Sequence, residues 1–380
     1  MGRTFMIGAA AAAAIVATGS AALAAAPILI GVQAPITGTY AEEGQGIQKA
    51  AQLLAEQQNA KGGLLGRQIE VKVCDDEGTA SQAAICARQL ADAHVVAVIG
   101  SYTSGAALAA EPIYARANII QSSDGTSDQL LERGYQTWFG NAPPNSAEAV
   151  FTANYLVNVR HFKRIAVLTD HSAYATGLAD AVEKDLKAVH GNVVDKAFIN
   201  AGSQNFTPVL TQIKSLDPDV LYFSGYYSDG GLIRAQMQQL GMTAVFVGGD
   251  ANQNVDFGKI AGAAAAGSLI INVPAPQDLP YPAAKQFVAD YQAKYGALPP
   301  SVYTLTNGDG MRAVMQAIAE TKTTDATKLE EYLHHLASFQ GVSGTFAWSA
   351  RGERIGSPFV VFEVDASGNY TVLYTKAPTH

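Results

Sequence analysis

The chain has 380 residues, with 25 lysines and arginines against 33 aspartates and glutamates, which gives a formal net charge of −8. An acidic balance of this kind argues against nucleic-acid backbones and anionic membrane surfaces as partners. The length exceeds the size at which one hydrophobic core keeps growing. We therefore expect two lobes, each large enough to bury a core of its own.

The first 24 residues have the layout of a secretory signal peptide. Arg3 supplies the positive charge, residues 6–16 form an apolar run, and Ala22-Leu23-Ala24 is a cleavage site of small residues. A retained membrane anchor is the alternative, but the apolar run is shorter than the ~20 residues that a span needs. We expect cleavage after Ala24 and export. No later segment is apolar enough to span, so the mature chain is not expected to be membrane-embedded.

The two cysteines, Cys74 and Cys86, are spaced neither like a zinc-binding pair nor like a redox Cys-x-x-Cys motif. Cys74 ends the predicted strand IEVKVC, and Cys86 lies in the following helix, SQAAICARQLA. Export favours a disulfide that ties the end of the strand to this helix. Two free, buried thiols are the alternative.

The first part of the mature chain alternates between strands and helices, a pattern that predicts a parallel sheet covered on both faces. A first helix has apolar residues at the 3.6 period around Ile47 and ends at Lys61-Gly62-Gly63. The Pro-rich segment 139–149 interrupts the alternation and marks a crossing to a second lobe. The predicted strands are 28–34, 69–74, 95–100 and 119–122, and the later helices are 80–93 and 105–117.

The alternation then starts again and predicts a second wound sheet. Its strands are 164–170, 192–199, 219–225, 244–250 and 268–273, and its helices are 176–189, 207–216 and 230–240. A second Pro-rich stretch, 273–282, marks a second crossing. Helices near 282–295, 301–320 and 326–337 are assigned to the first lobe, because no new run of strands is expected after them. Residues 357–375 alternate like a hairpin and are predicted to return to the second lobe.

The predicted fold is therefore α/β, with two lobes that are each a wound parallel sheet flanked by helices. Three crossings join the lobes. The first lobe comprises residues 27–143 plus 275–355, and the second comprises 144–274 plus 356–380.

A polar elbow of small residues, GSYTSGAA, follows the strand that ends at Gly100. It lacks the Lys and Ser or Thr of a phosphate loop, and Ser104 lacks the flanking glycines of a nucleophile elbow. A second elbow, QSSDGTSDQL, ends the next strand. Hydroxyls and N–H groups at helix starts suit a carboxylate, so Ser104 and Thr126 could face one ligand. The alternative is that Ser104 and Thr126 or Ser127 only cap their own helices.

The strand ends of the second lobe carry tyrosines and one acid, namely Tyr174, Tyr226, Tyr227 and Asp250. An acid in one lobe that faces an anion cradle in the other would suit a zwitterion, because a desolvated ammonium needs a charged partner. The alternative for Asp250 is an N-cap of the helix in NQNVDFGKIAG. A triad of Ser104, His171 and Asp250 has no local sequence signature, and the adjacent His334 and His335 diverge on a helix, which disfavours a metal site.

These segments together resemble the periplasmic leucine/isoleucine/valine-type binding proteins of ABC importers. The resemblance runs from GVQAPITGTYAEEGQG, through VIGSYTSGAALAAEPIYARANIIQSSDGTSDQL, YATGLADAV and PDVLYFSGYYSDGG, to GMTAVFVGGD, and covers essentially the whole mature chain. It implies a two-lobed Venus-flytrap fold of the first periplasmic-binding-protein class. It also implies a small amino-acid ligand, an inner-membrane ABC permease as partner, a periplasmic location, no cofactor and no catalysis.

The resemblance also assigns roles to individual residues. Ser104 and Thr126 would hold the ligand carboxylate. The backbone carbonyl of Asp124 and the side chain of Asp250 would hold the ammonium, and Tyr174 and Tyr226 would close over the ligand. Tyr102, in the first elbow, is a further candidate ligand-binding residue.

Two positions depart from the family pattern. Glu43 stands where relatives that bind aliphatic amino acids often have an aromatic residue, and Gly140 stands where many have an arginine. Glu43 either lines the cleft, which would favour a polar or basic amino acid, or only favours the start of a helix near Gln45. The same fold could instead bind an aromatic or aliphatic carboxylic acid or a small amide, or serve as a sensory receptor. An exported serine hydrolase is the other alternative.

Overall fold

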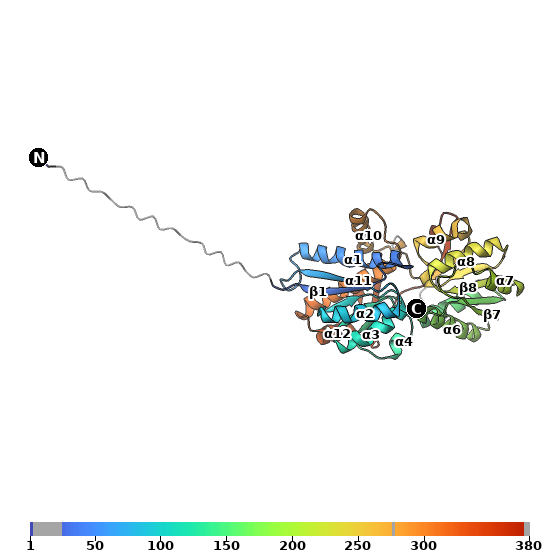
Figure 1. The fold of residues 1–380 in the computed structure, drawn as a ribbon, viewed down its shortest axis with the longest axis horizontal. Helices are drawn as coiled ribbons and strands as arrows, with labels where there is room; N and C mark the ends of the chain where they lie inside the picture. The colour runs from blue at the N-terminus through green and yellow to red at the C-terminus, as the bar shows by residue number, and fades with distance from the viewer. Residues whose placement is uncertain (3–24, 276–277, 376–380) are drawn as a thin grey trace.

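The computed structural model describes residues 1–2, 25–275 and 278–375. Figure 1 shows two lobes side by side, each built around a sheet with helices on both faces. Within the described residues, no helix combines the length and the apolar character needed to cross a membrane. The predicted signal peptide lies almost entirely outside the described residues.

The first lobe contains a parallel five-stranded sheet in the order β2-β1-β3-β4-β5. Helices α1, α11 and α12 pack on one face, and α2 and α3 pack on the other. β5 was not predicted, because it has three residues and the helix before it, α4, has only four, so neither shows a hydrophobic period. The elements are β1 (Ile28–Ala34), α1 (Ala41–Ala60), β2 (Ile69–Asp75), α2 (Ala80–Asp92), β3 (Ala97–Ile99), α3 (Ser104–Arg116), β4 (Ile120–Ser123), α4 (Gln129–Glu132) and β5 (Trp138–Gly140).

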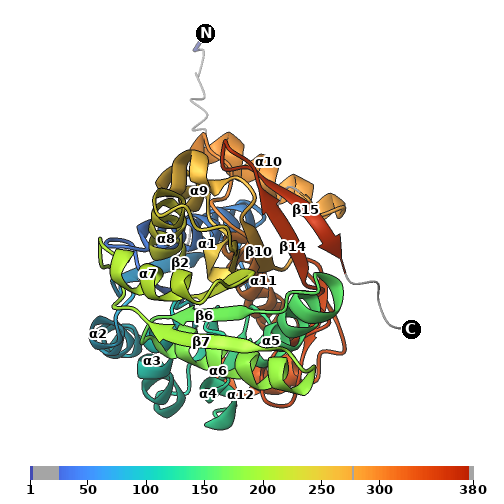
Figure 2. The same cartoon turned by 90° about the vertical axis from the view of Figure 1, so that its right-hand side faces the viewer.

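The second lobe contains a seven-stranded sheet in the order β15-β14-β10-β9-β8-β6-β7. Helices α5 and α6 pack on one face, and α7, α8 and α9 pack on the other (Figure 2). The elements are α5 (Asn145–Asn154), η1 (Tyr155–Val159), β6 (Ile165–Thr169), α6 (Ala173–Ala188), β7 (Val193–Phe198), α7 (Thr207–Ser215), β8 (Val220–Ser224), α8 (Tyr227–Gln239), β9 (Val245–Gly248), η2 (Asp250–Asn252), α9 (Val255–Ala261), η3 (Gly262–Ala265) and β10 (Leu269–Asn272).

The chain passes between the two sheets after β5, after β10 and again before β14. Helices α10 (Pro282–Tyr295), α11 (Tyr303–Thr321) and α12 (Ala326–His334) follow the second passage, and α10 and α11 pack against α1 as expected. The hairpin of β14 (Val360–Val364) and β15 (Tyr370–Thr375) pairs antiparallel with β10, so its predicted return to the second sheet is confirmed. The exact lobe borders stay a prediction.

The expectation that no new run of strands follows α12 before the C-terminal hairpin is wrong. A small antiparallel sheet is formed by β11 (Phe339–Gln340), β12 (Thr345–Trp348) and β13 (Arg354–Ile355). Strands of two to four residues leave almost no alternation in the sequence. Aromatic packing joins two of its strands, because the ring centroid of Phe339 in β11 lies 5.3 Å from that of Phe346 in β12.

A disulfide joins Cys74 in β2 to Cys86 in α2, as predicted, with 5.6 Å between the Cα atoms.

Replacing both cysteines by serine should lower the free energy of unfolding by about 3 kcal/mol, because the bridge restricts the unfolded chain. Differential scanning calorimetry measures the loss. Ligand affinity should stay unchanged, since neither cysteine lines the interlobe cavity described below. A thermal midpoint equal to that of the wild type would contradict the prediction.

Candidate functional site

Ser104 connects the two polar elbows of the first lobe. Its Oγ accepts hydrogen bonds from the backbone N–H groups of Thr126, at 3.1 Å, and Ser127, at 3.2 Å. Both lone pairs are then used, so its O–H remains free to donate to an anion. The alternative that Ser104 caps its own helix is wrong, because Thr103 caps α3 by accepting from the N–H of Ala106.

Gly100 allows this elbow to form. Its φ of +114° lies where residues other than glycine rarely go, and a Cβ at this position would lie 1.8 Å from the carbonyl oxygen of Gln33 in the neighbouring strand β1. The chain therefore turns sharply at the end of β3. This turn places Tyr102, Thr103 and Ser104 at the carboxyl edge of the sheet, where ligands of α/β proteins bind.

Asp250 provides the acid of the second lobe. β9 ends at Gly248, earlier than predicted, and Asp250 opens the short helix η2. Its Oδ1 accepts hydrogen bonds from the Tyr174 hydroxyl, at 2.5 Å, and from the N–H of Ala251, at 2.8 Å. The alternative role of Asp250 as an N-cap is wrong, because Asn254 caps α9.

Glu148, on α5, lies directly behind Asp250, and sequence reasoning missed it. Its Oε1 accepts a hydrogen bond from the backbone N–H of Asp250 at 3.2 Å, and both side chains are buried. Burial raises the pKa of both carboxyls, and the nearby Asp250 raises the pKa of Glu148 further. Hydrogen bonds from Tyr174 and Tyr303 oppose the shift at Asp250. The pKa of Glu148 is therefore raised further than that of Asp250, and Asp250 is the more acidic carboxyl of the pair.

The two half-sites meet at one small cavity between the lobes. The cavity volume is small, about 10 Å³. Seven of the eight ligand-binding residues predicted from the sequence line it, together with two that were not predicted, Ala251 and Tyr303. The lining residues are Tyr102, Ser104, Asp124, Thr126, Tyr174, Tyr226, Asp250, Ala251 and Tyr303.

Tyrosine rings form most of the apolar wall. The Tyr226 ring centroid lies 5.1 Å from that of Tyr174 and 5.8 Å from that of Tyr102, and Tyr102 in turn lies 5.4 Å from Tyr303. Tyr303 begins α11 and could have been suspected only from its place just after Pro299-Pro300. Tyr227 does not line the cavity; its hydroxyl donates to the backbone carbonyl of Thr39 across the lobes, at 3.2 Å.

The Asp124 side chain turns toward α11. Its Oδ1 accepts a hydrogen bond from the Thr306 hydroxyl at 2.8 Å, and its Oδ2 accepts from the Asn307 side-chain amide. Burial raises the pKa of this carboxyl well above its ordinary value. Both hydrogen bonds of the Asp124 side chain are therefore made within the first lobe. The contact of its backbone carbonyl with a ligand ammonium stays a prediction.

Glu43 does not line the cavity, although it was included among the ligand-binding candidates. Helix α1 begins at Ala41 rather than near Gln45, which places Glu43 in its first turn and fully buried. The Glu43 carboxylate accepts hydrogen bonds from Asn254 Nδ2 of the second lobe and from Ser301 Oγ, both at 2.6 Å. It therefore bridges the lobes beside the site.

Burial raises the pKa of Glu43 from 4.5 to about 7. Because the carboxyl has its higher pKa in the folded state, Glu43 contributes most to the free energy of unfolding below pH 4.5. This contribution of Glu43 falls as the pH rises to 7. The loss is about 3 kcal/mol at neutral pH. Glu43→Gln should therefore stabilise the protein more at pH 8 than at pH 5. Thermal midpoints at both pH values test this, with the exposed neighbour Glu42→Gln as control. An equal gain at both pH values would refute the prediction.

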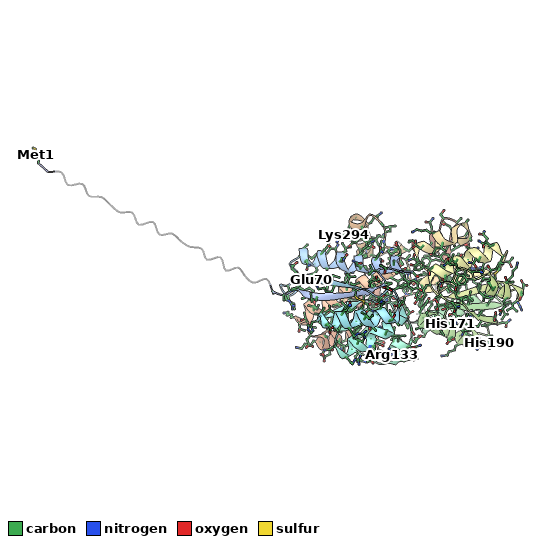
Figure 3. The ribbon with its side chains drawn as sticks, viewed as in Figure 1. Met1, Glu70, Arg133, His171, His190 and Lys294 are labelled. Atoms are coloured by element: carbon green, nitrogen blue, oxygen red, sulfur yellow. A yellow bond between two sulfur atoms is a disulfide. The ribbon has the colours of Figure 1, made fainter. Side chains whose placement is uncertain are left out.

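The described structure does not support a catalytic triad at Ser104. His171 is exposed and stacks on Phe198 with 5.1 Å between ring centroids. It is labelled in Figure 3 among side chains at the outside of the protein. None of the described residues that line the cavity is a histidine, and Asp250 is bonded to Tyr174 instead.

Known proteins resemble this chain over most of its length. The chain is similar to the Leu/Ile/Val-binding protein homolog 3 of Brucella melitensis, with 29% identity over 91% of this chain and 94% of the relative. It is also similar to an amino acid binding protein of Pseudomonas aeruginosa, with 30% identity over 91% of this chain and 92% of the relative.

Solved structures share the two-lobed fold. The leucine binding protein LivK of Thermotoga maritima superposes with a TM-score of 0.86 at 26% identity, over 92% of this chain and 99% of the other. The branched-chain amino acid transporter substrate binding protein LivJ of Streptococcus pneumoniae, in complex with isoleucine, gives a TM-score of 0.83 at 27% identity over the same shares. The predicted fold is thereby confirmed.

A family model described as periplasmic binding protein matches residues 27–369. This match spans both lobes and the cavity between them. The prediction that the chain is no enzyme is confirmed by this membership, since such proteins bind solutes for transport. The chain belongs to the periplasmic binding protein family.

Proposed function

We propose that this protein is the periplasmic receptor of an ABC importer and binds a free amino acid, of the branched-chain type or a polar relative, between its lobes. One observation carries the proposal: residues from both lobes meet at one cavity, with hydrogen-bond donors on one side and a buried acid on the other. The predicted signal peptide and an inner-membrane permease as partner are parts of this proposal.

The first lobe would hold the ligand carboxylate. The Ser104 O–H remains free to donate, and Thr126 lines the same side of the cavity. The start of α3 adds the partial positive charge of a helix N-terminus. The second lobe would hold the ammonium against the Asp250 carboxylate, to which the Tyr174 hydroxyl already donates.

Closure would bring these halves together and expel water. Charge-assisted hydrogen bonds then act in a medium of low dielectric constant, where they are stronger than in water. The closed arrangement is also the one that a permease can distinguish from the open one. The bonds from Asn254 to Glu43 and from Tyr227 to Thr39 join the lobes and favour the closed form.

Relatives indicate the class of ligand. LivJ of Streptococcus pneumoniae is in complex with isoleucine, and LivK of Thermotoga maritima is a leucine binding protein. A more distant relative, a solute binding protein of R. palustris, is in complex with benzoate. A plain carboxylic acid or a small amide is therefore the second candidate. Asp250 favours the amino acid, because a buried carboxylate has no use beside a ligand that lacks a positive charge.

A thermal-shift screen of the mature protein tests the proposal. We expect amino acids to raise the thermal midpoint, since a ligand that binds only the native state stabilises it by mass action. Carboxylic acids of similar size, including benzoate, should leave it unchanged. A response to carboxylic acids and to no amino acid would overturn the proposal. A sensory role is separated from transport by measuring uptake in cells that lack the gene.

A further inference from the structure

The first lobe contains a second, larger cavity. Its volume is about 480 Å³, which lies within the ~300–1,000 Å³ of ordinary small-molecule pockets. Helices α1, α10 and α11 and the strand β11 supply most of its wall, and it shares no lining residue with the interlobe cavity. The proposed function makes no use of this cavity.

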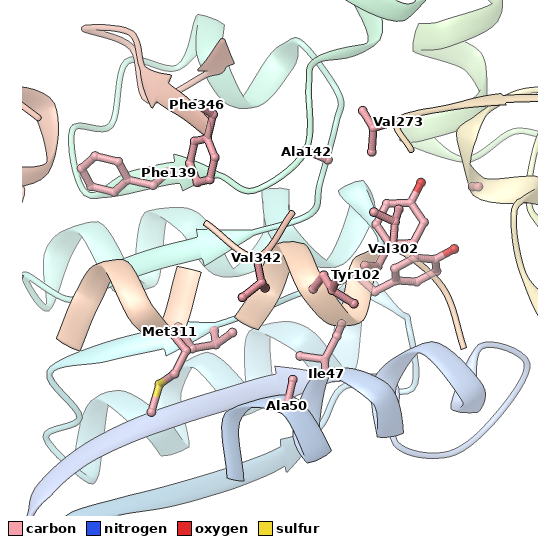
Figure 4. Close-up of a cluster of buried hydrophobic side chains, with 14 of the residues drawn as sticks. Ile47, Ala50, Tyr102, Phe139, Ala142, Val273, Val302, Met311, Val342 and Phe346 are labelled. Atoms are coloured by element: carbon pink, nitrogen blue, oxygen red, sulfur yellow. The ribbon is translucent and has the colours of Figure 1, made fainter. Parts of the chain in front are cut away.

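One part of the wall is apolar. Six buried side chains of the main hydrophobic core form it, namely Leu54, Leu64, Phe287, Met315, Phe339 and Val342. Figure 4 shows Val342 within this core cluster. Core side chains that face a cavity lack packing partners on that side, so an apolar group that covers them gains both contacts and hydrophobic free energy. A ligand of this cavity should therefore have an apolar body.

Arg312, on α11, gives the cavity a positive charge. Its side chain lines the cavity and is 32% exposed. Its Nη1 lies 3.7 Å from Asp309 Oδ1, too far for a hydrogen bond, and has no hydrogen-bond partner among the described residues. Asp309 instead accepts from the backbone N–H groups of Val342 and Ser343. The guanidinium therefore keeps N–H donors that can bind the two oxygens of a carboxylate side by side.

The acid in the described wall, Asp290, does not cancel this charge. Its Oδ2 accepts a hydrogen bond from Gln57 Nε2 at 2.8 Å, and its Oδ1 accepts from Gln286 Nε2 at 2.7 Å. These two amides hold the Asp290 carboxylate between α1 and α10. The exposed Lys61 adds a second cation to the wall. Cations therefore outnumber acids in the cavity, which favours an anion as ligand.

We propose that this cavity is a second binding site, which takes an amphipathic monocarboxylate: the carboxylate pairs with Arg312, and the hydrocarbon chain covers the apolar wall. The described lining residues belong to α1, α10, α11, β11 and the segments next to them, so binding does not require the lobes to close. The interlobe cavity, about 10 Å³, has no room for such a chain. An amino acid and a monocarboxylate should therefore bind independently of each other.

Titration calorimetry of the mature protein with sodium octanoate at pH 7 tests the proposal. We expect one octanoate to bind per chain. Octylammonium, which has the same hydrocarbon chain and the opposite charge, should not bind. Benzoate should bind at least tenfold more weakly than octanoate, because it covers less of the apolar wall.

Two variants locate the octanoate. Arg312→Gln should weaken octanoate binding roughly tenfold to a hundredfold, because hydrogen bonds with a charged donor are lost. Ala319→Trp should abolish binding, because Ala319 lines the cavity from α11 and the larger side chain would fill it. Ala319 is exposed, so this variant decides the question even if Arg312→Gln does not fold.

Arg88→Gln is the matched control, because Arg88 is exposed on α2, at the other face of the first sheet. It should leave the octanoate affinity unchanged, and so should Ser104→Ala at the interlobe cavity. Loss of octanoate binding in Ser104→Ala would place the carboxylate between the lobes and overturn the proposal. No binding of octanoate to the wild type, equal binding of octylammonium, or an unchanged affinity in either cavity variant would also overturn it. A failure of every amino acid to bind would overturn only the proposed function.

Discussion

Replacing Asp250 by asparagine should weaken binding of the cognate amino acid by roughly 2–5 kcal/mol, or about 30-fold to several thousand-fold. The substitution keeps the size of the side chain and can keep the bonds from Tyr174 and Ala251. It removes the only charge with which we propose to pair the ligand ammonium. An ammonium that leaves water without a counter-ion carries its full desolvation cost. Titration calorimetry at pH 7 measures the loss.

Asp256→Asn is the matched control for Asp250→Asn. Asp256 lies in the same lobe, at the start of α9, but its side chain is 30% exposed and pairs with Lys259 on the surface. Its loss should change the affinity by less than a factor of two or so, because exposed ion pairs contribute little. Equal affinities of Asp250→Asn and Asp256→Asn for the amino acid would show that Asp250 does not bind the ligand.

Replacing Arg354 by methionine should lower the free energy of unfolding by about 3–5 kcal/mol. Arg354 lies just before the third passage between the lobes and is almost fully buried. Burial lowers the pKa of its guanidinium to about 10, while the charge of Asp309 opposes that shift. The substitution would remove a cation near the buried carboxyls of Asp124 and Asp309, and it would leave Asp309 only with Arg312, whose Nη1 lies 3.7 Å from Asp309 Oδ1.

The hydrogen bonds of Arg354 also join segments that are far apart in the sequence. Its Nη1 donates to the Asn141 carbonyl at 2.8 Å, at the first passage, and its Nη2 donates to Ser343 Oγ at 3.0 Å. Asp309 accepts from the backbone N–H of Val342 and Ser343 in the same region. Loss of Arg354 should therefore loosen two of the three passages at once.

Chemical denaturation measures the cost of Arg354→Met, with Arg351→Met as control. Arg351 lies in the same turn but is 60% exposed and pairs with Glu353. This substitution should cost less than about 1 kcal/mol. If the two variants unfold at the same denaturant concentration, the buried charge of Arg354 does not stabilise the first lobe as proposed.

The sequence allowed the two wound sheets to be predicted because each long element carries a clear hydrophobic period. Examples are Ile47 with its apolar partners on α1, and the apolar strands before and after the first crossing. β5 and β11–β13 escaped because they have two to four residues each and lie outside the alternation of strands with long helices. Their pairing is set by neighbours that are distant in the chain.

Cavity-lining residues at strand ends were predictable for a different reason. In a wound sheet the carboxyl ends of parallel strands share one edge, so Ser104, Thr126 and Asp250 were candidates before any coordinates were known. Glu148 was missed because an acid in the first turn of a helix is ordinarily explained by the helix dipole. Tyr303 was missed because a tyrosine that begins a helix looks like a core residue.

The role of the Glu43 side chain could not be predicted from the local sequence pattern. Whether this side chain faces a ligand or another part of the protein depends on where α1 begins and on the position of Asn254 in the other lobe. Both are results of tertiary packing rather than of neighbouring residues in the sequence. The same applies to Ser104, whose Oγ accepts from an elbow in the next strand rather than from its own helix.

The double hydrogen bond to Ser104 Oγ also sets the order of events when a solute arrives. Both N–H donors belong to the same lobe as Ser104, so a wide separation of the lobes leaves this donor array assembled. Asp250 and Tyr174, in contrast, travel together as a unit on the opposite lobe. We expect capture to begin with the anionic end of the solute on a preorganised platform, and the cationic end to be enclosed afterwards.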